Sequence, residues 1–295
     1  WFDIPQWIPA IACLVILLAF NLLTVKLFGE LEFWFSIIKV ITIVALIIVG
    51  IILLVIGFKT NTGTVSVTNL WNDGGMFPNG ISGFLLSLQL VVFSFVGVEL
   101  VGVTAAETSD PKKNIPSAIN KIPLRILLFY VGALFVILSI NPWTQLNADS
   151  SPFVEVFSLV GIPVAAGIIN FVVLTSAASA CNSGLFSTSR ILYTLSKEKD
   201  APAKLSKLNK HSVPSNALYT SVIVVSIGAL LSKLVPEHAF TIVTSISAIC
   251  FIWVWSVILI CHIKYQKNRP DLREKTTFKA PLTPYINYVI LGLFL

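Results

Sequence analysis

One glutamate lies inside an otherwise apolar stretch of this chain. Residues 83–100, GFLLSLQLVVFSFVGVEL, have the composition of a membrane helix, and Glu99 lies in it beside Gly97 and Ser94. A charged side chain within a bilayer is costly unless it faces the interior of a helix bundle or a water-filled cavity. A second apolar stretch, EFWFSIIKVITIVALIIVG, carries Lys39, which has the opposite charge. Such a pair, beside a helix weakened by Gly and Ser, indicates a path for a proton, an ion or a solute.

The apolar residues gather in runs that are long enough to cross a membrane. Hydrophobic residues make up 56% of the chain and charged residues 12%, whereas soluble domains carry about 25% charged residues. A membrane-spanning helix needs roughly 20 apolar residues. The pattern predicts an all-α polytopic membrane protein with a single transmembrane transporter domain over residues 1–295. The expected spans are 8–24, 33–56, 83–103, 122–140, 163–188, 217–235, 240–261 and 285–295.

The two ends of the chain lie close to or within these spans. The first residue is Trp1 rather than Met, and the last expected span has only begun when the sequence stops. A helix that ended in mid-membrane would leave polar groups in the hydrocarbon region. We therefore expect the sequence to be an internal piece of a longer protein.

The distribution of positive charge predicts an orientation. If the segment before the first span is outside, then 17 of the 20 Lys and Arg residues lie in inner loops and 2 in outer loops. Cytoplasmic loops of membrane proteins carry this excess of Lys and Arg. We therefore expect a multi-pass protein of the cytoplasmic membrane with its basic loops in the cytoplasm. The net charge of +6 needs no nucleic-acid partner.

Few residues offer catalytic or metal-binding chemistry. The cysteines, Cys13, Cys181, Cys250 and Cys261, lie in apolar spans and form no CxxC pair. The three histidines show no ligand spacing, and no nucleophile or phosphate-loop motif occurs. We expect no metal and no cofactor, and a protein that is not an enzyme. Two alternatives are a seven-helix membrane receptor, against which the eighth span argues, and a polytopic membrane enzyme.

Three local patterns have both a functional and a structural interpretation. Gly97 weakens its helix by about 1 kcal/mol relative to Ala, which suits a discontinuous transporter helix but also a packing notch with Glu99 as a structural hydrogen-bonding group. Lys39 is either a buried ammonium or a side chain that extends to the interface. Small residues such as Thr175 and Ser176 allow close helix packing.

The loop after residue 103 contains two prolines. Pro111 and Pro116 predict helix breaks, with a short helix starting at Asn114.

Several of these segments resemble a known family. The segment FSFVGVELVGVTAAETSDPKKNIPSAINKIPLRILLFYVGALFV resembles the sixth helix and the following loop of amino acid permeases of the APC superfamily. EFWFSIIKV resembles their fifth helix, and GIINFVVLTSAASACNSGLFSTSRILYTLSKE resembles the eighth helix of the amino acid transporter (AAT) family. WIPA, SPF, GIINFVVLT and CNSG are most similar to the bacterial D-serine/D-alanine/glycine permeases.

The resemblance implies a fold and a set of roles. The family has twelve spans, ten of which form two inverted repeats in a LeuT-like transporter fold, and this chain corresponds to about helices four to eleven. The residue that matches Phe93 is an aromatic gate over the substrate, and the backbone near Val96 receives the amino group. Ser94 and Gly97 lie in the same substrate-binding segment. The family residue that matches Glu99 is implicated in the response of transport to protons.

The resemblance also assigns the second ionisable residue. The lysine that matches Lys39 replaces a sodium ion in proton-dependent relatives, and Thr175 and Ser176 lie near that sodium-site-like position. We therefore expect a secondary active, proton-coupled symporter that imports amino acids, with small neutral amino acids favoured. Its expected partners are an amino acid substrate, the proton and the lipid bilayer.

Overall fold

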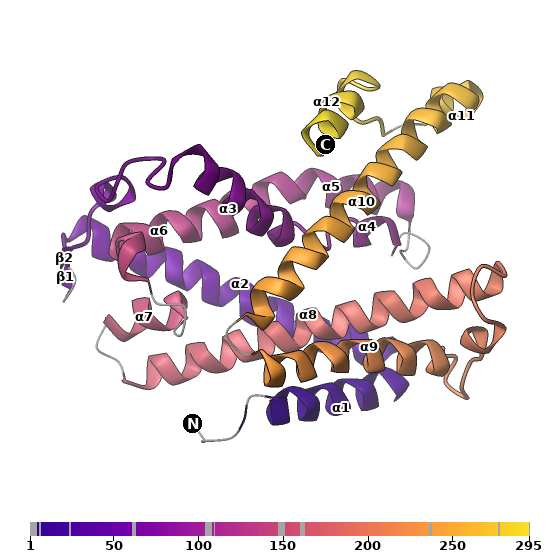
Figure 1. Cartoon of the computed structure of the whole chain (residues 1–295), viewed down its shortest axis with the longest axis horizontal. Helices are drawn as coiled ribbons and strands as arrows, with labels where there is room; N and C mark the ends of the chain where they lie inside the picture. The colour runs from indigo at the N-terminus through magenta and orange to yellow at the C-terminus, as the bar shows by residue number, and fades with distance from the viewer. Residues whose placement is uncertain are drawn as a thin grey trace. The chain divides into compact units, whose positions relative to one another are not determined.

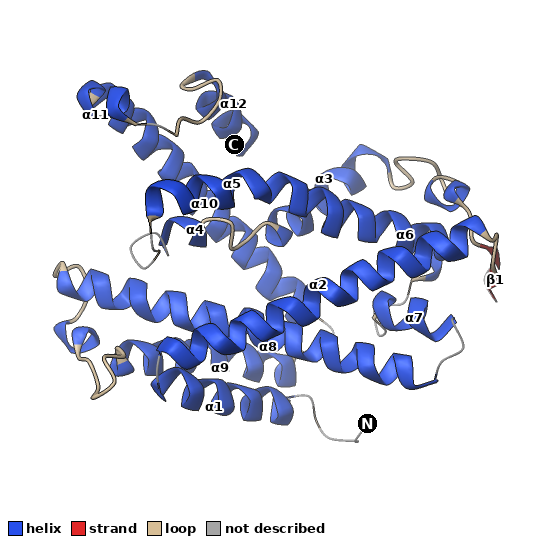
Figure 2. Cartoon of the chain, turned by 180° about the vertical axis from the view of Figure 1, so that it is seen from behind, coloured by secondary structure: helices blue, strands red, loops and turns tan. Residues whose placement is uncertain are grey.

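The chain is mostly helical in a computed structural model (Figures 1 and 2). The structure describes residues 5, 7–23, 25–60, 63–103, 108, 110–146, 151–159, 163–235, 238–276 and 278–294. Contacts within the chain divide it into two compact units. One comprises Trp1–Asn79 with Lys121–Pro236, and the other comprises Gly80–Asn120 with Glu237–Leu295. The single transporter domain expected from the sequence stays a prediction.

The first unit is built from long helices around two apolar clusters. Leu46, Val136 and Val156 belong to one cluster, and Leu17 and Leu185 belong to the other. The first cluster joins α2, α6 and α7, and the second joins α1, α8 and α9. The helices of this unit are α1 (Trp7–Leu23), α2 (Val25–Val55), α6 (Ala133–Ile140), α7 (Pro152–Leu159), α8 (Pro163–Lys197) and α9 (Ser215–Leu234).

Shorter elements connect these helices. The two-residue strands β1 (Lys59–Thr60) and β2 (Gly63–Thr64) pair antiparallel, with Lys59 opposite Thr64. The π-helical segment η3 (Leu127–Gly132) leads into α6. Short 3₁₀ helices are η1 (Val67–Leu70), η4 (Trp143–Gln145) and η5 (Ala203–Ser206).

Two close contacts fix the helices of the first unit. Gly50 of α2 lies against Val136 of α6, so that a Cβ atom at position 50 would lie 1.8 Å from Val136 Cγ1. Asn21 Nδ2 of α1 donates a hydrogen bond of 2.7 Å to Asn182 Oδ1 of α8, and both side chains are buried. A buried amide needs such a partner, because an unpaired one costs about 1–3 kcal/mol.

The second unit is organised around α10 (Ala239–Asn268), which packs against α3 (Gly80–Ser94) and α12 (Tyr285–Phe294). The short helices α4 (Leu100–Val103) and α11 (Pro270–Lys275) complete it. Helix α5 (Pro111–Ile126) begins in this unit and ends in the first. His262 of α10 contacts Asn287 of α12, with 3.0 Å between Nδ1 and Nδ2.

The expected break at Pro116 is wrong, and the helix starts earlier than Asn114. Helix α5 begins at Pro111 and continues through Pro116 and Pro123. Proline at the first helical position loses no hydrogen bond, because that N–H has no partner within the helix. Each later proline removes one hydrogen bond, and the remaining turns of this 16-residue helix tolerate the loss.

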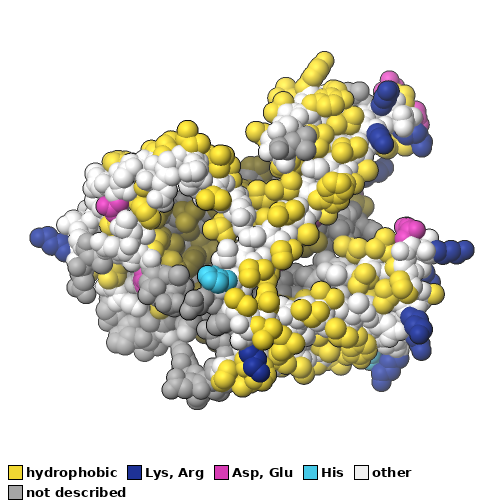
Figure 3. Space-filling model, in the orientation of Figure 1, with side chains coloured by type: hydrophobic (Ala, Val, Ile, Leu, Met, Phe, Trp, Pro, Cys, Tyr) yellow, Lys and Arg dark blue, Asp and Glu magenta, His cyan; other side chains and the backbone are white. Residues whose placement is uncertain are grey.

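Several helices have the length and surface of membrane spans. Among the described residues, four are long and apolar enough to cross a bilayer, and shorter apolar helices cover other expected spans. Hydrophobic side chains run along α10 (Figure 3), where Phe240, Ile249 and Trp253 are each about 70% exposed. Water disfavours apolar surfaces of this extent, whereas hydrocarbon accepts them. These candidate spans are Glu32–Val55 within α2, Pro111–Ile140 from α5 through α6, Gly167–Lys197 within α8, and Ala239–Asn268, which is α10.

Candidate functional site

The helix that contains Glu99 is interrupted just before this residue. Helix α3 ends at Ser94, and α4 begins at Leu100. The intervening backbone forms tight turns, with hydrogen bonds from Val96 N to Phe93 O and from Leu100 N to Gly97 O, both 3.1 Å. Gly97 has a φ of +104°, a conformation that a residue with a Cβ atom rarely adopts. The glycine therefore permits the break that the sequence indicates at this position.

The carboxylate of Glu99 folds back onto this break. Both of its oxygens accept from the backbone N–H of Gly97, at 3.1 Å each. Oε2 also accepts from Nε1 of Trp255 on α10, at 3.2 Å. The half-buried carboxylate thus satisfies a backbone donor that the interrupted helix would leave unpaired. It also connects the break to a neighbouring helix.

A second polar contact joins α10 to α3, the helix before the break. Gln89 Nε2 of α3 donates a hydrogen bond to Ser245 Oγ of α10. The Trp255 ring lies 6.1 Å from the rings of both Phe251 and Phe294, measured between centroids. Aromatic neighbours at this distance restrict the indole, so that its N–H is held towards Glu99.

The residues expected to bind substrate lie at the end of α3 and in the turns that follow. Phe93 and Ser94 form the end of the helix, and Val96 and Gly97 lie in the break; all four are half-buried. Ser94 Oγ donates a hydrogen bond of 2.7 Å to Val91 O. Their assignment to substrate stays a prediction.

Lys39 lies on α2, in the other unit, and its side chain reaches α8. Nζ donates a hydrogen bond of 2.8 Å to Ser179 Oγ, and Ser179 Oγ donates one of 2.7 Å to Glu32 Oε1. Lys39 Nζ and Glu32 Oε1 are 3.9 Å apart. Ser179 is fully buried, and the two charged side chains are each 28% exposed. The ammonium thus has a hydroxyl and a carboxylate as partners.

The Thr175–Ser176 pair lies close to this group without bonding to it in the described contacts. Thr175 Oγ1 and Ser176 Oγ both donate to the backbone oxygen of Val172, at 2.9 and 2.7 Å. Lys39 therefore approaches the helix expected from the sequence, but its partner is Ser179, about one turn beyond the expected pair.

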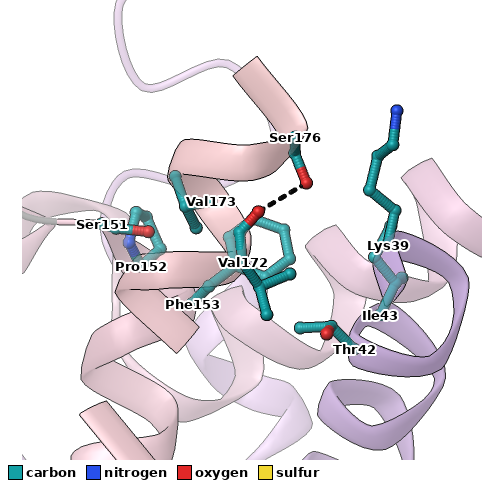
Figure 4. Close-up of a pocket in the computed structure, with 9 residues that line it drawn as sticks. All are labelled: Lys39, Thr42, Ile43, Ser151, Pro152, Phe153, Val172, Val173 and Ser176. Carbon is teal, nitrogen blue, oxygen red and sulfur yellow. Dashed lines mark hydrogen bonds between the residues drawn. The ribbon is translucent and has the colours of Figure 1, made fainter. Parts of the chain in front are cut away.

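A cavity of about 350 Å³ lies beside Lys39, between α2, α8 and the start of α7 (Figure 4). Its walls are mostly apolar. The Lys39 ammonium points away from Thr42 and Ile43, and the Ser176 hydroxyl is turned to the Val172 oxygen. The lining residues are Lys39, Thr42, Ile43, Ser151, Pro152, Phe153, Val172, Val173 and Ser176.

Three residues of these two groups were not expected from the sequence. Trp255 lies in a long apolar run and looks like any lipid-facing aromatic residue. Glu32 precedes the expected start of its span at residue 33, although it lies seven residues, or about two helical turns, from Lys39. Ser179 is one of many small residues on α8. Helical spacing from Lys39 and Ser176 could have drawn attention to Glu32 and Ser179.

The described residues contain no group of three or more His, Cys, Asp or Glu side chains that could hold a metal ion. The two groups built around Glu99 and Lys39 offer hydrogen bonding and charge instead.

Comparison with known proteins identifies the family. The family model described as "Amino acid permease" matches residues 1–295. The chain is 60% identical to the amino-acid permease AapA of Bacillus subtilis and 59% identical to the uncharacterized transporter YdgF of the same organism, each over 98% of the chain. It is 50% identical, over its whole length, to the D-serine/D-alanine/glycine transporter of Escherichia coli K12. The chain spans 63% of the length of each of these relatives. It belongs to the amino acid permease family, whose members are polytopic membrane transporters and not enzymes.

Proposed function

We propose that the protein imports small neutral amino acids across the cytoplasmic membrane and that protons drive this import. The observation that carries the proposal is the broken helix α3–α4 with the Glu99 carboxylate folded onto it. Membership of the amino acid permease family supports the class of substrate. The name of the Escherichia coli relative, D-serine/D-alanine/glycine transporter, supports small and uncharged side chains.

The broken helix provides groups that suit an amino acid. Discontinuous helices in transporters expose backbone groups at the middle of the membrane, where they meet charged parts of the substrate. In our proposal the turns around Val96 accept the substrate amino group, and Phe93 covers it. Ser94 and Gly97 shape the space beside them.

The contacts of Glu99 suggest how a proton could act on this segment. An ionised carboxylate only accepts hydrogen bonds, whereas a protonated one also donates. A proton on Glu99 would therefore disturb the three contacts that its oxygens accept from Gly97 and Trp255. The backbone conformation of the break and the proton occupancy of Glu99 are then linked, and each biases the other through differential affinity.

Lys39 has a second role in this proposal. Its ammonium joins α2 to α8 through Ser179. Loss of a proton would remove the charge from this contact and weaken the attraction to Glu32. The relative stability of two arrangements of these helices would then depend on whether Lys39 carries its proton. This is the requirement for coupling a proton gradient to a conformational change.

Transport by purified protein in liposomes tests the proposal. Full-length protein would be reconstituted, and radiolabelled glycine, D-alanine and D-serine offered with the outside more acidic than the inside. We expect accumulation of these amino acids that a protonophore abolishes, and much less accumulation of labelled arginine or glutamate. Uptake that ignores the pH gradient, or that requires sodium, would contradict proton coupling. A preference for charged amino acids would contradict the proposed substrate class.

The proposed orientation follows the distribution of basic residues. The loops that contain Lys112, Lys204 and Lys267 would face the cytoplasm, and the segment before α1 would lie outside.

With family membership established, the receptor interpretation has no remaining support, because no feature of the described residues favours it over transport.

A further inference from the structure

Three side chains of the first unit form a directed series of hydrogen bonds. Lys39 Nζ donates to Ser179 Oγ at 2.8 Å, and Ser179 Oγ donates to Glu32 Oε1 at 2.7 Å. Each donor therefore points the same way, from the ammonium towards the carboxylate. Two consecutive bonds of this length, with a hydroxyl that both accepts and donates, are the geometry that a proton relay requires.

The carboxylate of Glu32, at the end of this series, has one oxygen that accepts no hydrogen bond within the described residues. That oxygen is Oε2, which is buried. The other oxygen, Oε1, accepts the hydrogen bond from Ser179. A proton that arrives at Oε1 therefore breaks no hydrogen bond at Oε2 within the described residues.

The charged residues of α8 lie far from this group. The charged residues of α8 are Arg190 and Lys197, both near its C-terminal end, at least 11 residues after Ser179. At 1.5 Å per residue this separation is about 16 Å. Glu30 also lies on α2 but is exposed. Cys181, on α8, is half-buried. Within the described contacts, Lys39 and Glu32 are the ionisable residues that bond to Ser179.

The two ends of the series lie at different levels of the helix. Lys39 lines the cavity together with Thr42 and Ile43, which follow it on α2. Glu32 precedes Lys39 by seven residues, towards the end of α2 at Val25. The charge distribution predicts that this end is cytoplasmic. A proton that reaches Lys39 from the cavity would therefore move towards the cytoplasm when it passes to Glu32.

We propose that Glu32 is the proton acceptor of Lys39 and that Ser179 relays the proton between them. In this step an N–H bond of the Lys39 ammonium breaks and a new O–H bond forms at Ser179, while the original Ser179 O–H bond breaks and an O–H bond forms at Glu32 Oε1. The products are a neutral amine, an unchanged serine and a neutral carboxylic acid. No oxidant, reductant or other co-reactant takes part. The inference rests on the proposed proton-coupled function.

The exchange also explains why an ion pair is placed here. Before the step both charged groups lie on α2 and share a hydrogen-bonded contact with Ser179 of α8, and after it both are uncharged. Loss of both charges at once avoids leaving a single unpaired charge in a membrane protein, which is the costly alternative. The contact between the helices thereby weakens without a charged intermediate. A helix pair that can separate in this way is a candidate for the moving part of a transporter.

Glu32→Gln tests the proposal, with Glu30→Gln as the matched control. Both substitutions remove one carboxylate from α2 within two residues, but Glu30 is exposed. The full-length protein would be reconstituted in liposomes. Two rates would be compared: accumulation driven by a pH gradient, and exchange of labelled for unlabelled glycine without any gradient. We expect Glu32→Gln to lower accumulation about tenfold or more relative to exchange, and Glu30→Gln to behave as the unmodified protein.

Ser179 variants separate a relay from a structural contact. Ser179→Ala leaves both charges in place and removes the hydroxyl, so we expect the same selective loss of accumulation. Ser179→Thr keeps a hydroxyl, and we expect it to restore accumulation. If Glu32→Gln also abolishes exchange, Ser179→Ala decides, and unchanged accumulation in this variant overturns the relay.

The outcomes distinguish this inference from the proposed function. If the unmodified protein accumulates glycine in response to the pH gradient and Glu32→Gln does so equally well, the relay is wrong and the proposed function stands. If the unmodified protein exchanges glycine but ignores the gradient, proton coupling is wrong, and the relay falls with it.

Discussion

Replacing Trp255 with Phe should weaken transport through the loss of one hydrogen bond. The indole Nε1 donates to Glu99 Oε2 at 3.2 Å. Phenylalanine keeps an aromatic ring between Phe251 and Phe294, whose centroids lie 6.1 Å from that of Trp255. The substitution therefore removes the donor and leaves most of the apolar packing in place. Glu99 retains the Gly97 N–H as a partner.

The size of the effect follows from the length of this bond. A hydrogen bond to a charged group contributes about 1.5–3 kcal/mol. The 3.2 Å separation lies at the long end of the usual range for N–H···O bonds, so we take the lower value of about 1.5 kcal/mol. This corresponds to roughly a tenfold smaller population of the arrangement in which Glu99 holds the break. If uptake needs this arrangement, its apparent kcat/KM should fall by about the same factor.

Uptake of radiolabelled glycine by the full-length protein in liposomes measures this effect. Trp253→Phe is the matched control, because Trp253 lies on the same helix and is 71% exposed. We expect a roughly tenfold lower kcat/KM for Trp255→Phe and an unchanged value for Trp253→Phe. Equal values for the two variants would refute the argument that the indole N–H supports the break through Glu99.

Three further substitutions test other parts of the structure. Glu99→Gln should flatten the pH dependence of uptake more than it weakens substrate binding, and an unchanged pH profile would count against a proton on this residue. Lys39→Ala should lower gradient-driven accumulation about tenfold while the protein still inserts into membranes, as measured by its yield in washed membrane fractions; full accumulation would contradict its role. Gly50→Ala should lower the melting temperature in detergent, because its Cβ atom would meet Val136 Cγ1 at 1.8 Å and overpacking costs about 1–3 kcal/mol. Adding Val136→Ala should recover most of this loss, and an unaltered melting temperature for Gly50→Ala alone would show that the two helices separate easily.

The break before Glu99 could be predicted because its cause is local. Gly97 and Ser94 weaken an apolar helix, and the charge of Glu99 requires partners nearby. The contact with Trp255 could not be predicted in the same way, since 156 residues separate the two side chains. An aromatic residue in an apolar helix also has a sufficient reason to be there without any polar partner. Only the folded arrangement of α3 and α10 brings the indole to the carboxylate.

The surroundings of Lys39 were predicted in part. The resemblance led to α8, where the structure brings Lys39, but the hydroxyl that it contacts belongs to Ser179 and not to Thr175 or Ser176. Helical periodicity limits the choice to one face but not to one turn, because residues three or four apart share a face. Glu32 lies at the margin of the apolar run, where a carboxylate is unremarkable in the sequence.

The length of α8 determines how it can fit a bilayer. Its 35 residues span about 52 Å, whereas the hydrocarbon core is about 30 Å thick. Even a tilt of about 40°, at the upper end of the observed range, leaves about 40 Å along the membrane normal. Part of α8 must therefore extend beyond the lipid tails, and the turns from Arg190 to Lys197 carry the charged residues that suit this position. The following loop, which carries Lys199, Lys204, Lys207 and Lys210, then lies at or beyond the level of the headgroups. Trypsin added to sealed vesicles will reach this loop from one side only, and the side from which it cuts gives the direction in which the protein was inserted.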